Sequence, residues 1–157
     1  MKSHLFTLAL LAAVPIAFSA EIEGATQRLA LCLQFPTNAF VAGQPVPATV
    51  VLQNGTTNAM PVPFASRSSI QLFILNQRKE PLSPTNTSIW HTYSGPSSVL
   101  LPGKVRKEFC YDLRTIFDLG APGKYYAFAT AVRFRGHWEK LPQLRSATNE
   151  FLVLAPR

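Results

Sequence analysis

Two cysteines, Cys32 and Cys110, are the side chains with the most obvious chemistry in this 157-residue sequence. An even cysteine count favours a disulfide in a protein exported from the cytoplasm. Each cysteine alternates with apolar residues in a strand pattern, so both should point away from the core. If the first and fifth strands flank the second, the cysteines lie about 9–10 Å apart, whereas a disulfide needs Cα atoms within about 7 Å. A disulfide and two free thiols therefore both remain open.

Metal-binding and catalytic patterns are weak. His91, His137 and Met60, with the cysteines, are the residue types of a copper site, but they are scattered along the chain. Hydrolysis needs a nucleophile, a base and an orienting group. Serines, Asp112 and Asp118 are present, but no GxSxG, HExxH or phosphate-cradling motif groups them, and the few acids are not paired as in a glycosidase. The sequence predicts no enzymatic activity, no metal and no cofactor.

The most distinctive polar segment is "RFRGHWEKLPQLR", residues 133–145, which would join the last two strands. Tryptophan and arginine are the side chains that most often anchor protein interfaces. Basic residues beside an aromatic also resemble single-stranded nucleic-acid binders, but an exported protein rarely needs that activity. The alternative is a solvated hairpin whose tryptophan folds back over its own strands. The candidate partner-binding residues are Arg133, Arg135, His137, Trp138, Lys140 and Arg145.

The strand before this segment supplies a second candidate surface. If Tyr125 and the alternating alanines face inward, then Tyr126, Phe128 and Phe134 face outward. An aromatic row on an exposed sheet face is an apolar patch of the kind that marks partner binding. The alternatives are an inverted parity, or coverage of this face by residues 88–98, in which case their aromatic side chains would be core or lid residues.

Alternating apolar residues and turn residues predict about seven short strands. Thirteen prolines and eight glycines interrupt the chain, and helical spacing with capping residues is nearly absent. The Asn54-Gly55 pair predicts a tight turn, residues 113–119 one helical turn between sheets, and residues 36–47 and 61–69 Pro-rich connections. The expected strands are residues 28–35, 46–55, 69–76, 88–93, 104–113, 124–134 and 149–155. Such a pattern indicates an all-β, two-sheet antiparallel sandwich.

Three stretches carry a family resemblance. "APGKYYAF", with Gly123 and Tyr125, resembles the corner before the sixth strand of bacterial exported immunoglobulin-like domains, where a tyrosine hydroxyl bonds back to the backbone. "GQPVPATVVLQNG" resembles their second strand and "SATNEFLVL" their last. The resemblance spans roughly residues 27–155 and implies an immunoglobulin-like sandwich. The group includes proteinase-inhibitor-like domains, but no inhibitory loop motif can be carried over residue by residue.

The first twenty residues predict export. Lys2 precedes an apolar run from Leu5 to Phe18, and "AFSA" offers small residues for cleavage after Ser19 or Ala20. The run is about 14 residues long and is interrupted by Pro15, too short for a spanning helix. We therefore expect a signal peptide at residues 1–20 and a single domain at residues 21–157, secreted or periplasmic and not membrane-spanning.

Charge suggests a class of partner. The chain carries a formal net charge of +7, which falls to +6 if cleavage of the signal peptide removes Lys2. A basic surface favours anionic partners, although such a charge can also simply keep an exported protein soluble. The resulting hypothesis is a non-catalytic, exported immunoglobulin-like domain that binds a protein or an anionic envelope component, and not nucleic acid. The alternative is a proteinase inhibitor that acts through loops at the end of the sandwich.

Overall fold

Strands dominate the described part of the chain, which comprises residues 29–62, 70–87, 99–131 and 144–156 of a computed structural model. One short 3-10 helix, η3, spans Leu113–Thr115. The strands are β1 (Leu29–Gln34), β2 (Ala39–Val41), β3 (Pro47–Asn54), β4 (Met60–Val62), β5 (Ile70–Leu75), β6 (Val99–Leu101), β7 (Arg106–Asp112), β8 (Gly123–Ala131) and β9 (Asn149–Leu154).

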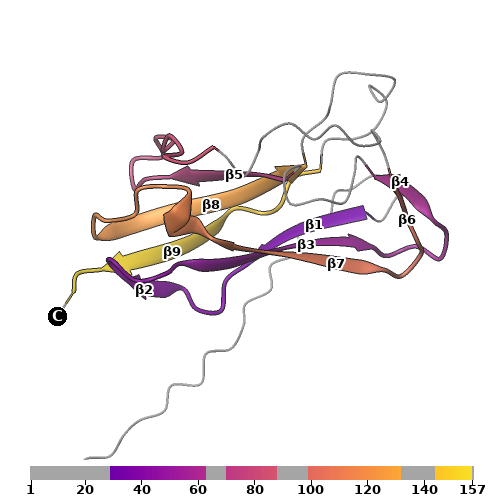
Figure 1. Ribbon diagram of the computed structural model, residues 1–157, viewed down its shortest axis with the longest axis horizontal. Coiled ribbons are helices and arrows are strands. Elements are labelled where there is room, and N and C mark those ends of the chain that lie inside the picture. Colours follow the sequence, from indigo (N-terminus) through magenta and orange to yellow (C-terminus); the bar gives the residue numbers. More distant parts are fainter. Residues whose placement is uncertain (1–28, 63–69, 88–98, 132–143, 157) are drawn as a thin grey trace, which may run out of the picture.

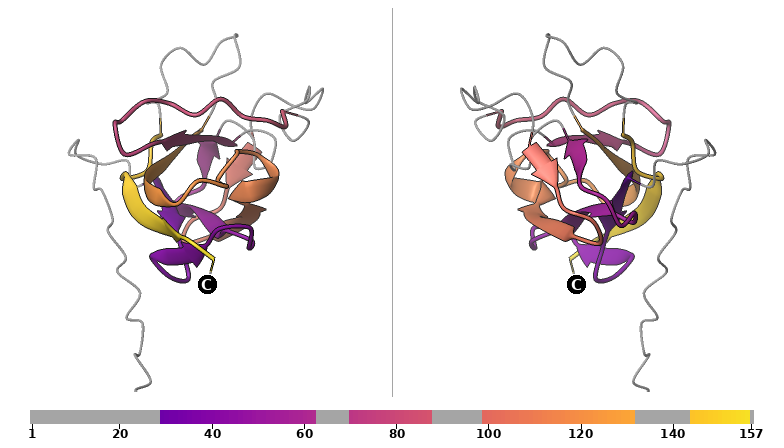
Figure 2. Two further views of the ribbon diagram at one scale, coloured as in Figure 1. Left: turned by 90° about the vertical axis from the view of Figure 1, so that its left-hand side faces the viewer. Right: turned by 90° about the vertical axis from the view of Figure 1, so that its right-hand side faces the viewer.

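The strands form two layers (Figure 1). One layer is a three-stranded sheet in the order β1-β3-β7, and the other is a four-stranded sheet in the order β2-β9-β8-β5. Figure 2 shows the two layers from the ends of the molecule, and the β4-β6 pair lies at one end (Figure 1). This is the all-β, immunoglobulin-like sandwich that the sequence predicts. One pair differs from the expected antiparallel arrangement, because β2 runs parallel to β9.

Most of the expected strands are present, but three short ones were not expected. The structure contains β1, β3, β5, β7, β8 and β9 close to their predicted positions, whereas residues 88–93 lie outside the described part of the chain. Strands β2 and β4 fall in the two stretches interpreted as Pro-rich connections, and β6 falls in a stretch with no predicted element. Each has three residues, which is too short for an alternating pattern to be recognised.

The core lies between the inner faces of the two sheets. Ala127 and Ala129 of β8 are only 1% and 0% exposed, which confirms the parity expected from the sequence. They lie opposite Ile74 and Leu72 of β5, which are also buried. Small side chains on β8 leave room for large residues of the opposing sheet, because protein interiors are packed at nearly constant density.

The predicted helical turn between the sheets is η3, and Asp112 builds it. The Asp112 carboxylate accepts a hydrogen bond from the Arg114 backbone N–H at 3.1 Å and another from the Val46 N–H at 2.9 Å. The first caps the helix and the second fastens the helix to the segment before β3. Behind this cap, Ile116 and Phe117 are buried. The Asp112 carboxylate therefore has a structural role.

The corner before β8 has the hydrogen bond that the family resemblance implies. The Tyr125 hydroxyl donates to the Ala121 carbonyl oxygen at 2.7 Å, and the tyrosine is 6% exposed. Burial raises the pKa of the Tyr125 phenol above its ordinary value, and the negative charge of Asp118 raises it further. The neutral phenol is thus the form that the folded chain favours.

Replacing Tyr125 with phenylalanine should lower stability by about 1 kcal/mol at neutral pH, because one hydrogen bond is lost. It should also flatten the alkaline part of the stability profile. A phenol pKa raised by folding stabilises the native state below the unfolded pKa of about 10, and this contribution is lost as pH rises through the folded pKa. Urea denaturation of both proteins between pH 7 and pH 11 measures the difference. A constant difference across that range would contradict the prediction.

Candidate partner-binding face

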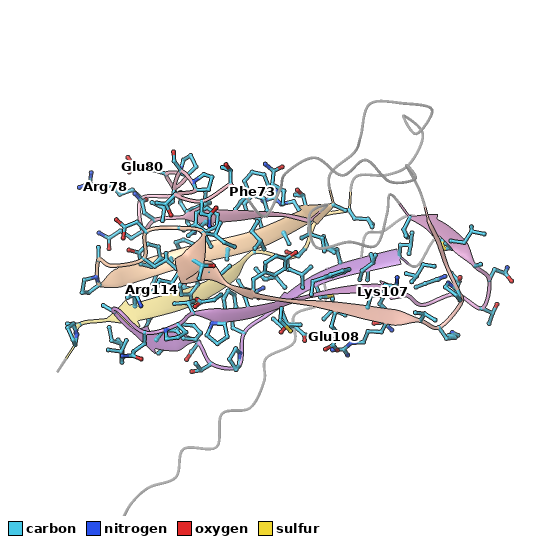
Figure 3. All side chains as sticks on the ribbon, in the orientation of Figure 1. Phe73, Arg78, Glu80, Lys107, Glu108 and Arg114 are labelled. Atoms are coloured by element: carbon cyan, nitrogen blue, oxygen red, sulfur yellow. The ribbon has the colours of Figure 1, made fainter. Side chains whose placement is uncertain are left out.

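Two phenylalanines stack on the outward side of the four-stranded sheet. Phe73 of β5 lies directly opposite Phe128 of β8 in the strand register. Their ring centroids are 4.8 Å apart and their planes differ by 9°. Figure 3 shows Phe73 on the side of β5 that faces away from the three-stranded sheet. Both rings are half-buried rather than sealed in the core, so they form part of the molecular surface.

Each of two aromatic rings on β8 has a cation over it. The Arg145 guanidinium carbon lies 3.9 Å from the centroid of Phe128, and the Lys79 ammonium lies over Tyr126. Cation–π contacts of this kind are favourable by about 0.5–1 kcal/mol at exposed sites. Neither cation forms an ion pair with a carboxylate among the described residues. We call Phe73, Lys79, Tyr126, Phe128 and Arg145 the aromatic face.

The turn after β5 directs Lys79 towards Tyr126. The Asn76 side-chain oxygen accepts hydrogen bonds from the backbone N–H groups of Arg78 and Glu80, at 2.8 and 3.1 Å. The Asn76 amide donates to the Glu80 carboxylate at 2.8 Å. Lys79 adopts a left-handed conformation with φ 64°, which reverses the chain. Beside this turn, Arg78 and Lys124 contribute to the lining of a shallow pocket of about 250 Å³.

An irregularity beside β8 places Arg145. Ala127 pairs with Asn149, and Thr130 pairs with Arg145. Three residue steps along β8 are therefore matched by four steps on the neighbouring segment. The extra residue is a bulge. The buried Ser146 hydroxyl satisfies the Ala129 N–H there at 2.9 Å. With this bulge in place, the Arg145 side chain points outward, on the same side of the sheet as Phe128.

The rest of this sheet surface combines an ion pair with exposed aliphatic side chains. Lys124 contacts Glu150 at 2.8 Å. The hydrogen bond and charge of Glu150 raise the pKa of the lysine. Farther along, on β2 and β9, are Val41, Leu152 and Leu154, which are 41%, 37% and 47% exposed. The outward surface of the four-stranded sheet is therefore aromatic and cationic at β5 and β8 and aliphatic at β2 and β9.

The outer surface of the other sheet contains the two cysteines. Cys32 lies opposite Val51, and Cys110 lies opposite Thr49. The strands β1 and β7 thus flank β3, as the sequence predicts. Cys110 Sγ is 3.9 Å from the Thr49 hydroxyl oxygen. Both thiols are free in this structure, and the strand β3 lies between the two strands that carry them.

The structure describes only some of the candidate residues. Tyr126, Phe128 and Arg145 come together on the aromatic face. Sequence reasoning missed Phe73, although it has the opposite parity to buried Ile70, Leu72 and Ile74 within one strand pattern. It also missed Lys79, whose position depends on the turn. The candidates Arg133, Phe134, Arg135, His137, Trp138 and Lys140 lie outside the described residues.

The described residues contain no group of three or more histidine, cysteine or acidic side chains that could hold a metal ion. Asp112 caps η3, and the Asp118 carboxylate accepts from the Gly120 N–H at 3.0 Å. Both carboxylates therefore organise backbone. Within the same ranges of the chain, no helix has the length and apolar character needed to cross a bilayer.

Comparisons with known proteins found similarity to solved structures only. No protein-family model matches the chain, and no curated protein matches it. Among solved structures, the chain is similar to the CARDB domain of the PF1109 protein from Pyrococcus furiosus, which was determined in complex with di-metal ions. The sequences are 14% identical, the TM-score is 0.43, and the match covers 87% of this chain and 95% of that domain.

Proposed function

We propose that this chain is an exported, non-catalytic immunoglobulin-like domain that binds a protein or anionic envelope partner through the aromatic face. The observation that carries the proposal is the stack of Phe73 on Phe128 with Arg145 above it, on the outer surface of the sheet. Export rests on the signal-peptide pattern of residues 1–20.

Physical chemistry favours binding at this face over a purely structural role. An aromatic pair on the inner side of a sheet gains by leaving water, but the pair here is only half-buried. Further burial by a partner would release the remaining apolar surface from water, at roughly 25 cal/mol per Å². Arginine stacked on a ring is also held in place before binding, so less side-chain entropy is lost when it contacts a partner.

Substituting both Phe128 and Arg145 with alanine should reduce partner capture by about tenfold or more, because such anchors dominate interface energies. The measurement is quantitative pull-down from the envelope and exported fractions of the source organism, with the tagged full chain as bait. Thermal denaturation verifies that the variant is folded. Arg106→Ala is the matched control, because Arg106 is an exposed arginine on the three-stranded sheet.

The comparison among the three baits decides the outcome. A partner retained by the wild type and by Arg106→Ala, and lost by the double variant, supports the proposal. Equal recovery of every enriched protein by the wild type and the double variant would contradict it, since binding would then occur elsewhere on the domain.

A further inference from the structure

We propose that the aromatic face recognises an extended acidic peptide segment whose carboxylates stand at alternate residues. This inference rests on the proposed function and specifies its partner. It starts from the spacing of the two cations that lie over β8 side chains. Tyr126 and Phe128 are two residues apart on one strand and face the same side, so their positions are about 7 Å apart along the strand. Lys79 lies over the first and Arg145 over the second.

An extended peptide has the same repeat. Its alternate side chains point to one side and recur every 6.6–6.8 Å or so. A peptide that lies along β8 could therefore present one carboxylate to Lys79 and the next same-side carboxylate to Arg145. The intervening side chains would point to solvent. Same-face side chains of a helix have Cβ atoms only about 5–6 Å apart, a shorter repeat than the roughly 7 Å that separates these two positions.

The charges of this face leave room for two carboxylates. The described cations on this side of the sheet are Lys79 and Arg145 of the aromatic face and Lys124 beside it, and the described carboxylate is that of Glu150, which lies opposite Tyr126 in the register. Lys124 already pairs with Glu150. On the adjacent turn, Arg78 and Glu80 balance each other in charge, and Glu80 accepts a hydrogen bond from Asn76. Lys79 and Arg145 are thus the unneutralised charges of this surface among the described residues.

Ring geometry favours a peptide over a polysaccharide or a nucleic acid. Sugars and bases that bind aromatic side chains stack on an open ring face. Here Phe128 is stacked with Phe73 and has Arg145 over it, and Tyr126 has Lys79 over it. The groups that a ligand can contact are instead the N–H groups of the Arg145 guanidinium and of the Lys79 ammonium. A guanidinium can bind a carboxylate with two parallel hydrogen bonds, and its stacking on Phe128 fixes the plane in which it does so.

The test measures binding of labelled ten-residue peptides to the purified full chain by fluorescence anisotropy. One peptide alternates glutamate with threonine, a second has the same composition with its glutamates in pairs separated by pairs of threonines (EETTEETTET), and a third is the alternating peptide with glutamine in place of glutamate. We expect the alternating peptide to bind at least about threefold more tightly than the paired isomer, in which no two glutamates are two residues apart, and the neutral peptide to bind most weakly, because only the alternating one presents same-side carboxylates to both cations.

Substitutions connect the binding to this face. Lys79→Gln and Arg145→Gln should each weaken binding of the alternating peptide by about three- to tenfold. Arg106→Gln, which removes the same charge from the opposite sheet, should change it by less than twofold. A linear polyuronate and a single-stranded thymidine oligonucleotide are measured in parallel. Tighter binding of either polymer would overturn the assignment to a peptide.

The inference and the proposed function can fail separately. Equal affinity for the alternating and paired peptides, or equal affinity of Arg145→Gln and Arg106→Gln for the alternating peptide, overturns the acidic segment as ligand. If the Phe128 and Arg145 double variant still loses its native partner, the proposed function stands with a partner of different chemistry. If native capture is also unchanged, both are wrong.

Discussion

Replacing Phe151 with alanine is expected to lower the free energy of unfolding by about 3–5 kcal/mol, the range for truncating a buried phenylalanine. Phe151 is 0% exposed and lies opposite Tyr125 in the register of β9 and β8. Its ring centroid is 5.1 Å from that of Phe35, 5.9 Å from that of Phe40 and 5.6 Å from that of Tyr125. Truncation would open a cavity where β2, β8, β9 and the end of β1 meet. Equilibrium denaturation in urea measures the loss.

Two substitutions isolate the cavity as the cause. Phe151→Leu retains much of the buried volume and should cost clearly less than Phe151→Ala, since the cost of truncation rises with the cavity that remains. Leu152→Ala changes the adjacent residue, whose side chain points outward and is 37% exposed, and should alter stability by no more than about 0.5 kcal/mol. A loss below about 1 kcal/mol for Phe151→Ala would show that this cluster is not part of a packed core.

The fold could be predicted from the sequence where a long strand has a clear alternating pattern within its own residues. In the nine-residue strand β8, Ala127, Ala129 and Ala131 alternate with Tyr126, Phe128 and Thr130, so a single parity assignment determines which side chains enter the core. The tyrosine before these alanines fixes the strand within the sandwich, through its hydroxyl bond to Ala121. Local sequence therefore specified both the strand and the direction of its side chains.

The missed strands depend on partners far away in the chain. Strand β2 exists because Val41 pairs with Leu154 in a parallel ladder, and nothing within its three residues identifies that partner. The same applies to β4, which pairs with β6 across a stretch of chain that includes β5. Strands this short are stabilised by long-range pairing, and sequence periodicity does not report such contacts.

The candidate face was predictable only in its aromatic half. Parity indicated that Tyr126 and Phe128 face outward, but the cations above them come from other segments. Lys79 reaches Tyr126 because the Asn76 side chain organises a turn, and Arg145 reaches Phe128 because a bulge sets its direction. Turn geometry and bulge position are three-dimensional properties, so composition alone could not place these charges.

Replacing Asn54 with alanine is the second change from which we expect a large loss of stability, about 2–4 kcal/mol. The Asn54-Gly55 pair indicated an ordinary tight turn, but the Asn54 side chain is fully buried. Its amide donates to the carbonyl oxygens of Asn58, Leu101 and Pro102 at 2.8, 3.0 and 3.2 Å. Its oxygen accepts from the backbone N–H and the hydroxyl of Thr56, at 3.0 and 2.7 Å.

The size of the loss follows from the groups left behind. Alanine would leave several backbone groups without the partner that Asn54 supplied, and each unsatisfied buried group costs about 1–3 kcal/mol. Water cannot easily replace the amide, because the loops after β3 and after β6 approach so closely that a Cβ on Gly103 would collide with the Thr57 backbone. Asn54 therefore ties together two loops that are about fifty residues apart in the chain.

Two further variants make this prediction specific. Asn58→Ala removes the same kind of side chain from an exposed position of the same loop, so its effect should stay within about 0.5 kcal/mol. Asn54→Asp removes the donors and places a carboxylate beside three carbonyl oxygens, which should raise its folded pKa. Its stability should therefore be lowest at neutral pH and improve as pH falls through that pKa. Urea denaturation of all variants at pH 4 and pH 7 measures these effects, and equal stability of Asn54→Ala and Asn58→Ala would contradict the role assigned to Asn54.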